Sequence, residues 1–364
     1  MTHGSSAVRR RHQGNDAGAA GSPTDKMCSG RLNELLRIDR EALARHPEAV
    51  ATGLVLFTVA IWGSTPQVTS VGSDHSQPFT LTMLRALPTG LVLLAAMPML
   101  RFRFPRGRSA WAFTTVSGLL MVGVFLGGFT EGIARAGPGP AIVMSSTSPL
   151  WVAVLSRVVY RERIALRTAA GLLVGFLGVI LVFSSQLDSS SGAGNVALGL
   201  AFALAAALGW AIGTLIVKEQ LTRQPETDLL GVVAGQYLIG GIVLLVLSSL
   251  IEGSGGAQWG SADLWLSVAF ISIVGSAIAT LAYFAALRMI SATRVTAWSF
   301  LSPVVAILIG LGLGTVPKAL VFIGMGITIV GVFVVNLPSR EPRESLAELA
   351  EDAELGVALD SVGA

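Results

Sequence analysis

Charged and chemically reactive side chains are scarce in this chain of 364 residues. Only 13% of the residues are charged, and there are one cysteine and four histidines. The single Cys28 cannot form an internal disulfide, and the histidines lack the spacing of metal ligands. The chain also lacks a glycine-rich phosphate loop with a lysine and a Ser, His and acid set suited to hydrolysis. We therefore expect no metal, no cofactor, no ATP-driven cycle and no enzyme activity.

Long apolar stretches are what the chain has in abundance. Hydrophobic residues make up 52% of the sequence and the mean hydropathy is +0.69, as in chains embedded in lipid. A membrane-spanning helix needs about 20 apolar residues. Ten stretches meet this need, at residues 49–69, 78–100, 109–134, 138–159, 165–184, 196–218, 229–251, 263–288, 292–313 and 317–337. The predicted fold class is an all-α integral membrane protein with ten transmembrane helices in a lipid bilayer.

The ten stretches form two sets of five, and the second set repeats the order of the first. Ser148 and Pro149 in the fourth stretch recur 154 positions later as Ser302 and Pro303. A unit with an odd number of spans enters the membrane with opposite polarity when it is repeated, so the two repeats are expected to be inverted. We expect the following parts: a largely disordered basic tail at 1–48, repeats at 49–187 and 196–338, and an acidic tail at 339–364.

Basic residues indicate how the spans are oriented. Of the 25 Lys and Arg, 22 fall in the amino-terminal tail, in loops on one side of the membrane or after the tenth span. The exceptions are Arg135, Lys318 and Arg85, of which Arg85 lies inside a span. Cationic loops stay in the cytoplasm, so both termini are expected to be cytoplasmic and the protein to lie in the cytoplasmic membrane. Topology thus explains the pI of about 9.4 without a nucleic-acid partner.

Several short motifs occur in a fixed order between Ala49 and Leu337. They are Trp62-Gly63, Pro78 followed by Arg85, Thr147-Ser148-Pro149-Leu150, Tyr160-Arg161-Glu162-Arg163-Ile164 and Gly171. Together they resemble the EamA-type transporters of the drug/metabolite transporter superfamily. The resemblance implies a ten-helix bundle that moves small metabolites, often outward, and leaves the substrate open. The chain departs from the family at Gly314-Thr315-Val316-Pro317, where an acidic residue commonly follows the ninth helix.

Two ionisable residues lie inside predicted spans, and each such group costs about 2.5–3.5 kcal/mol to insert. Arg85 lies about 10 Å below the outer end of the second helix, and Glu131 lies near the outer end of the third. We expect the two to face each other or one wet cavity, with Glu131 binding a proton or a substrate ammonium and Arg85 a substrate carboxylate. A fixed ion pair, or two side chains that reach the outer interface, is an equal alternative.

Polar, aromatic and proline residues inside the spans are further candidates for a substrate site, and the segment around Trp62 in the first repeat resembles the segment around Trp210 in the second. Proline inside a span opens backbone carbonyls to a ligand. The candidates are Trp62, Gln67, Ser145, Ser148, Pro149, Trp210, Tyr283, Trp298, Ser302, Pro303 and Gln236, which stands near the position that corresponds to Arg85. For any single serine, hydrogen bonding to its own helix backbone is the competing interpretation. Glycines such as Gly171, Gly178, Gly324 and Gly331 are expected to serve helix packing instead.

The function that these patterns favour is secondary transport of a small metabolite or drug-like solute, outward, by alternating access. Protons are a candidate coupling ion, and the protein is expected to be a monomer or a homodimer. An importer of a small organic solute has the same topology. Two other classes are weaker: a membrane enzyme would need acidic or histidine clusters at an interface, and a non-transporting sensor or assembly protein would need a sizeable soluble domain.

Overall fold

The computed structural model of the chain describes residues 47–161, 164–187, 196–253, 256–314 and 316–337, except for the side chains of 185–187. The predicted tails, apart from Pro47 and Glu48, and the loop residue Glu162 lie outside these ranges. Within them the chain is helical, and its one β feature is an isolated antiparallel bridge between Ser76 and Ala257.

Ten helical segments are long and apolar enough to cross a membrane, which confirms the predicted fold class. They run over Pro47–Ser73, Pro78–Leu100, Gly107–Ala136, Pro138–Val159, Leu166–Ser184, Val196–Arg223, Leu229–Ile251, Ala262–Met289, Ala292–Gly312 and Ala319–Asn336. The first, third and sixth segments extend past their predicted ends. Hydropathy marks only the part of a helix that lies in hydrocarbon, whereas backbone hydrogen bonding continues into the polar layer.

Six spans are single, unbroken helices. These are α2 (Pro47–Ser73), α3 (Pro78–Leu100), α8 (Leu166–Leu187), α9 (Val196–Arg223), α10 (Leu229–Ile251) and α15 (Ala319–Asn336). The remaining four spans, the third and fourth of each repeat, are divided into segments. Because the divisions fall at corresponding places, the repeat is visible in the backbone as well as in the sequence.

The third and eighth spans each contain a π-helical stretch. The third consists of α4 (Gly107–Gly118), η1 (Leu119–Val124) and α5 (Phe125–Ala136). The eighth consists of α11 (Ala262–Ala269), η2 (Phe270–Ile278) and α12 (Ala279–Met289). The wider π turn is rare and is concentrated at functional sites.

The fourth and ninth spans are broken just before their prolines. The fourth consists of α6 (Pro138–Ser145) and α7 (Ser148–Val159), and the ninth of α13 (Ala292–Ala297), the 3₁₀ turn η3 (Trp298–Leu301) and α14 (Ser302–Gly312). Pro149 and Pro303 occupy the first turns of α7 and α14, where a missing N–H leaves no helical bond unmade.

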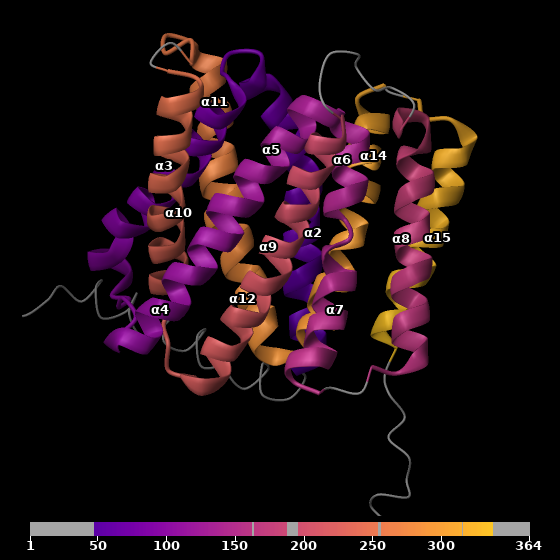
Figure 1. Ribbon diagram of the computed structural model, residues 1–364, viewed down its shortest axis with the longest axis horizontal. Coiled ribbons are helices and arrows are strands. Elements are labelled where there is room, and N and C mark those ends of the chain that lie inside the picture. The colour runs from indigo at the N-terminus through magenta and orange to yellow at the C-terminus, as the bar shows by residue number, and fades with distance from the viewer. Residues whose placement is uncertain (1–46, 162–163, 188–195, 254–255, 315, 338–364) are drawn as a thin grey trace, which may run out of the picture. The chain divides into compact units, whose positions relative to one another are not determined.

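Corresponding helices of the two repeats pack on each other. The closest pairs are α3 with α10 and α8 with α15, which lie at opposite sides of the bundle in Figure 1, and α7 packs on α13. At the α8–α15 contact, a Cβ on Gly178 would lie 2.3 Å from Thr328 Oγ1, and one on Gly171 would lie 2.9 Å from the Gly331 carbonyl oxygen. This close approach confirms that these glycines serve packing.

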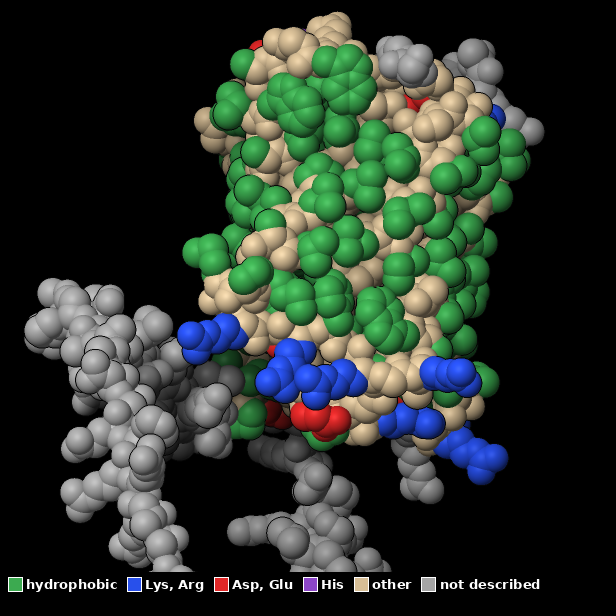
Figure 2. Space-filling view, turned by 90° about the vertical axis from the view of Figure 1, so that its left-hand side faces the viewer, with side chains coloured by type: hydrophobic (Ala, Val, Ile, Leu, Met, Phe, Trp, Pro, Cys, Tyr) green, Lys and Arg blue, Asp and Glu red, His purple; other side chains and the backbone are tan. Residues whose placement is uncertain are grey.

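The sides of the helix bundle carry many exposed apolar side chains. Figure 2 shows hydrophobic side chains over most of one flank and a band of Lys and Arg at the lower end. Large aliphatic side chains on the flank are well exposed, for example Leu91 at 53% and Ile242 at 55%. Exposed apolar side chains in such number require lipid as the surrounding solvent.

Candidate functional site

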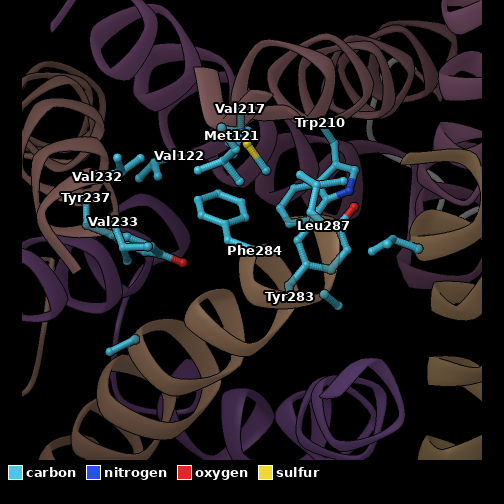
Figure 3. Packing of buried hydrophobic residues seen from close by; sticks show 14 of the residues in the cluster. Met121, Val122, Trp210, Val217, Val232, Val233, Tyr237, Tyr283, Phe284 and Leu287 are labelled. Carbon is cyan, nitrogen blue, oxygen red and sulfur yellow. The ribbon is translucent and has the colours of Figure 1, made fainter. Parts of the chain in front are cut away.

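Three aromatic side chains from three helices meet where the repeats face each other. The rings of Trp62 on α2 and Trp210 on α9 are edge to face at 5.3 Å between centroids, and each lies 5.4 Å from the ring of Tyr283 on α12. Phe125 extends the group, 4.8 Å from Trp210. Figure 3 shows Trp210, Leu287 and Tyr283 grouped together to one side of Phe284. We call Trp62, Trp210, Tyr283 and Phe125 the aromatic cluster.

A polar group borders the aromatic cluster on the side of η2. The Trp62 Nε1 donates a hydrogen bond to the Gly275 carbonyl oxygen at 3.1 Å, and Arg85 Nη2 donates to the same oxygen at 3.3 Å. Arg85 Nε also donates to Ser276 Oγ at 2.8 Å. The guanidinium on α3 and the indole edge on α2 are therefore neighbours across a single carbonyl oxygen of the π-helical stretch.

Glu131 does not pair with Arg85, so the expected pairing is wrong. Its carboxylate accepts a hydrogen bond from Arg135 Nε at 2.5 Å, and the Arg135 guanidinium lies over the Phe202 ring, 5.8 Å from the centroid. Residues four apart on an α-helix are neighbours, so Arg135 on the next turn of α5 is the nearer partner. Within the described ranges, Arg85 has hydroxyl and carbonyl partners rather than a carboxylate.

The crossing of α2 and α14 forms a second polar spot next to the aromatic cluster. Gly63, the neighbour of Trp62, packs so closely that an added Cβ would lie 2.5 Å from Val305 Cβ and 2.9 Å from the Ser302 carbonyl oxygen. One turn further along, Gln67 Nε2 donates to the Ala306 carbonyl oxygen at 2.8 Å.

Three buried polar atoms of α2 and the broken ninth span have no hydrogen-bond partner within the part of the chain that the structure describes. They are Gln67 Oε1, Trp298 Nε1 and Ser302 Oγ. Leaving such an atom unpaired costs about 1–3 kcal/mol. A solute, a water molecule or a second arrangement of the broken ninth span would relieve this cost, so Trp298, Ser302 and the following Pro303 stay candidates for the site.

The remaining predicted residues have local structural partners. Ser145 Oγ donates to the Ile142 carbonyl oxygen of its own helix at 3.0 Å, and Ser148 is buried beside Pro149 at the start of α7. Gln236 is 1% exposed, and its Nε2 donates to Ser117 Oγ at 2.7 Å between α10 and α4. The structure therefore gathers Trp62, Trp210, Tyr283 and Arg85 in one place and leaves Glu131, Ser145 and Gln236 outside it.

Sequence reasoning missed Gly275, Ser276 and Phe125. Gly275 and Ser276 accept the hydrogen bonds of Trp62 and Arg85, and Phe125 packs on Trp210. The available signal was the adjacent pair of small residues Gly275 and Ser276 in an otherwise large apolar run. No sequence pattern distinguishes a π-helical stretch from an α-helical one here, because both bury the same apolar side chains.

Two inverted sets of five membrane helices, with broken helices at matched positions beside a central cluster, define the architecture of a secondary transporter. The EamA-like transporter family matches residues 50–184 and again 197–337, and the chain belongs to this family. Among its relatives, the uncharacterised transporter YvbV of Bacillus subtilis is 27% identical over 84% of this chain and 98% of its own length. The uncharacterised inner membrane transporter YedA of Escherichia coli is 28% identical over 78% of this chain and 90% of its own length.

A plant relative and a solved structure extend the likeness. A WAT1-related chloroplastic protein of Arabidopsis thaliana is 28% identical over 76% of this chain and 67% of its own length. A crystal structure superposes with a TM-score of 0.68 at 21% identity, covering 79% of this chain and 97% of its own. At that identity the superposition concerns the fold alone.

Proposed function

We propose that the protein is a secondary transporter that exports a small organic solute across the cytoplasmic membrane by alternating access. The observation that carries the proposal is the meeting of matched residues from both repeats, Trp62 and Trp210, beside the broken ninth span. A site shared by two inverted repeats can be reached from either side when the repeats exchange conformations. The outward direction rests on the family resemblance.

The two halves of the ninth span differ in burial, which supports an outer opening. In α13, which lies at the predicted cytoplasmic end, all residues except Arg294 are buried, whereas in α14 only Val304 is buried. A buried inner half and a more exposed outer half, which still packs on α2 along one side, are what a state open to the outside would show.

Cysteine accessibility tests this opening, because Cys28 can be replaced to give a cysteine-free background. We expect Ala306→Cys on α14 to react with a membrane-impermeant maleimide added outside intact cells. Ala297→Cys on α13, the matched control, is expected to stay unlabelled. Equal labelling of both, or labelling of position 297 alone, would contradict an outward-open state with cytoplasmic termini.

Direction and substrate are tested by metabolite profiling of cells and medium with the protein absent, produced normally or overproduced. Export predicts a solute that accumulates in the medium in proportion to the protein, whereas import predicts accumulation inside. No change in any solute between the three strains would count against transport.

Glu131 is the candidate for proton coupling, and its local pairing supplies a matched control. Glu131→Gln is expected to abolish the dependence of transport on the proton gradient in proteoliposomes. Glu219 forms the same kind of pair, with Arg223 four residues later, at the opposite end of the bundle. Glu219→Gln removes that pair and is expected to leave the dependence on the proton gradient unchanged. Unchanged coupling in Glu131→Gln would remove Glu131 from the proposal.

A further inference from the structure

Arg85 has hydrogen-bonding capacity that the protein does not use. A guanidinium carries five N–H donors in a fixed plane. Two donate inside the protein, from Nε to Ser276 Oγ and from Nη2 to the Gly275 carbonyl oxygen, and both acceptors are neutral. The side chain is partly exposed, although it lies about 10 Å along α3 from its outer end. Its remaining donors are therefore open to a further acceptor.

The positive charge of Arg85 is not neutralised by a carboxylate in the described ranges. The ion pairs there join His75 to Asp263, Arg135 to Glu131, Arg223 to Glu219 and Arg294 to Glu48. The one carboxylate within the neighbouring spans at a similar depth, Glu131, is held by Arg135. A charge inside the membrane is expensive without a counter-ion, so an anion that enters from solution would gain more here than a neutral solute.

A flat apolar surface adjoins this charge. The Trp62 indole edge and the Arg85 guanidinium both donate to the Gly275 carbonyl oxygen, so each lies within 3.3 Å of it. The Trp62 ring itself is partly exposed, and behind it the buried rings of Trp210 and Tyr283, 9% and 1% exposed, lie 5.3 Å and 5.4 Å away. Offset and edge-to-face contacts between such rings and a planar apolar group are favourable.

We propose that Arg85 and the aromatic cluster bind an organic anion, with the guanidinium on a carboxylate and the partly exposed Trp62 ring against a flat apolar group, while the buried Trp210 and Tyr283 rings support Trp62 from behind. The proposal rests on the transport function above and names the chemical class of its substrate. Ser276 and the Gly275 carbonyl are positioning groups, because they hold the guanidinium in one orientation. A planar guanidinium binds a carboxylate through two parallel hydrogen bonds, which an ammonium cannot do.

Binding to the purified full chain tests the proposal with three matched probes: 3-phenylpropionate, 3-phenylpropanamide and 3-phenylpropylammonium. Because a hydrogen bond to a charged group contributes about 1.5–3 kcal/mol, we expect the carboxylate to bind at least about tenfold more tightly than the amide or the ammonium. Arg85→Gln is expected to bind carboxylate and amide equally. Arg85→Lys is expected to keep part of the preference, and Arg108→Gln on the exposed start of α4 all of it.

Three results would overturn the proposal: equal affinity for the three probes, no binding of the carboxylate to the intact chain, or an unchanged preference in Arg85→Gln. A melting temperature recorded for each variant separates loss of binding from loss of folding. If Arg85→Gln does not fold, the preference of the intact chain and its reduction in Arg85→Lys decide the matter.

Flux of the same probes in proteoliposomes separates this proposal from the transport function. Flux of the amide or the ammonium but not of the carboxylate would overturn the anion site and leave transport in place. Selective carboxylate binding without flux of any probe would leave the anion site in place and count against transport.

Discussion

Each repeat is joined to the other by a side-chain hydrogen bond at a corresponding place, but the residues that form the two bonds differ. In the first, Arg85 on α3 donates to Ser276 on η2, and in the second, Gln236 on α10 donates to Ser117 on α4. Each bond runs from the second helix of one repeat to the third helix of the other. The Arg85 connection carries a charge and is partly exposed, whereas the Gln236 connection is neutral and 1% exposed.

This difference shows how a symmetric fold produces a one-sided site. The helices must meet in both repeats, so a hydrogen bond is retained in both. On the Arg85 side, the guanidinium has unused N–H donors and lies beside the Trp62 indole. The Gly275 carbonyl oxygen there accepts hydrogen bonds from both side chains. We infer that the Gln236 side serves stability and the Arg85 side serves the solute.

The largest contrast is expected between alanine substitutions at Gly118 and Gly275. A Cβ on Gly118 would lie 2.8 Å from Gln236 Cα, whereas a Cβ on Gly275 would lie 3.3 Å from its nearest neighbour, Thr65 Oγ1. Overpacking against backbone costs about 1–3 kcal/mol, so Gly118→Ala should lower the free energy of unfolding by that amount. Gly275→Ala should be close to neutral. Unfolding in SDS–detergent mixtures measures both, and equal effects would contradict the difference in packing.

Removing the Gln236 hydrogen bond is expected to have a smaller effect, on stability alone. Gln236→Leu loses one neutral hydrogen bond, worth about 0.5–1.5 kcal/mol, while Ser117 keeps its bond to the Phe113 carbonyl oxygen. Transport per folded molecule should stay within about twofold, since stability and transport are separate on this side. A loss of transport in Gln236→Leu protein that melts normally would show that the hydrogen bond between Gln236 and Ser117 also takes part in the transport cycle.

Trp62→Phe tests the indole beside Arg85. The change keeps a ring in the aromatic cluster but removes the donor to Gly275, so solute affinity should fall about two- to tenfold. Trp265→Phe is the matched control, because it also loses an indole bond to a carbonyl oxygen, that of Trp259, at an exposed position. The dissociation constant of the carboxylate probe measures the effect, and an equal change in both variants would contradict a specific role for Trp62.

The smallest effects are expected where the second helix of each repeat begins. The Glu252 carboxylate at the end of α10 accepts from the backbone N–H groups of Phe79 and Thr80, at 2.6 Å and 2.7 Å. Asp228 caps its own helix by accepting from the Leu230 N–H at 3.1 Å, and its other oxygen accepts from the Arg103 backbone N–H in the loop after α3, also at 3.1 Å. A negative charge at a helix N-terminus contributes about 0.3–1 kcal/mol, so Glu252→Gln and Asp228→Asn should each lower unfolding free energy by that much.

These two variants also sharpen the comparison of the repeats. Glu252 joins two helices, so its loss should loosen the contact between α3 and α10 as well as the start of α3. Amide hydrogen exchange should therefore rise at the outer ends of both helices in Glu252→Gln, but at the start of α10 and at the loop residue Arg103 in Asp228→Asn. Exchange confined to one helix in both variants would show that Glu252 is a local cap.

The sequence predicted the parts of the fold that follow from composition and periodicity. Apolar length set the ten spans, and the Ser-Pro pairs at positions 148–149 and 302–303 marked the broken fourth and ninth spans. Matching also identified Trp62 and Trp210 as counterparts, and they meet at the centre. Such features depend on residues near each other in the chain or on comparison of the chain with itself.

What the sequence by itself determined is a lipid-embedded protein of ten helices in two inverted repeats, because hydrocarbon demands long apolar helices and an odd repeat must invert. Only the tertiary structure decided the partners of Arg85. Depth alone matched Arg85 with Glu131, but side chains at one depth on two packed helices can point in different directions: α3 and α5 meet through Thr82 and Thr130, while Glu131 pairs with Arg135 on the next turn of its own helix. The π-helical stretch then turned the Gly275 carbonyl oxygen toward Arg85 and Trp62, an arrangement that depends on helix packing between distant segments.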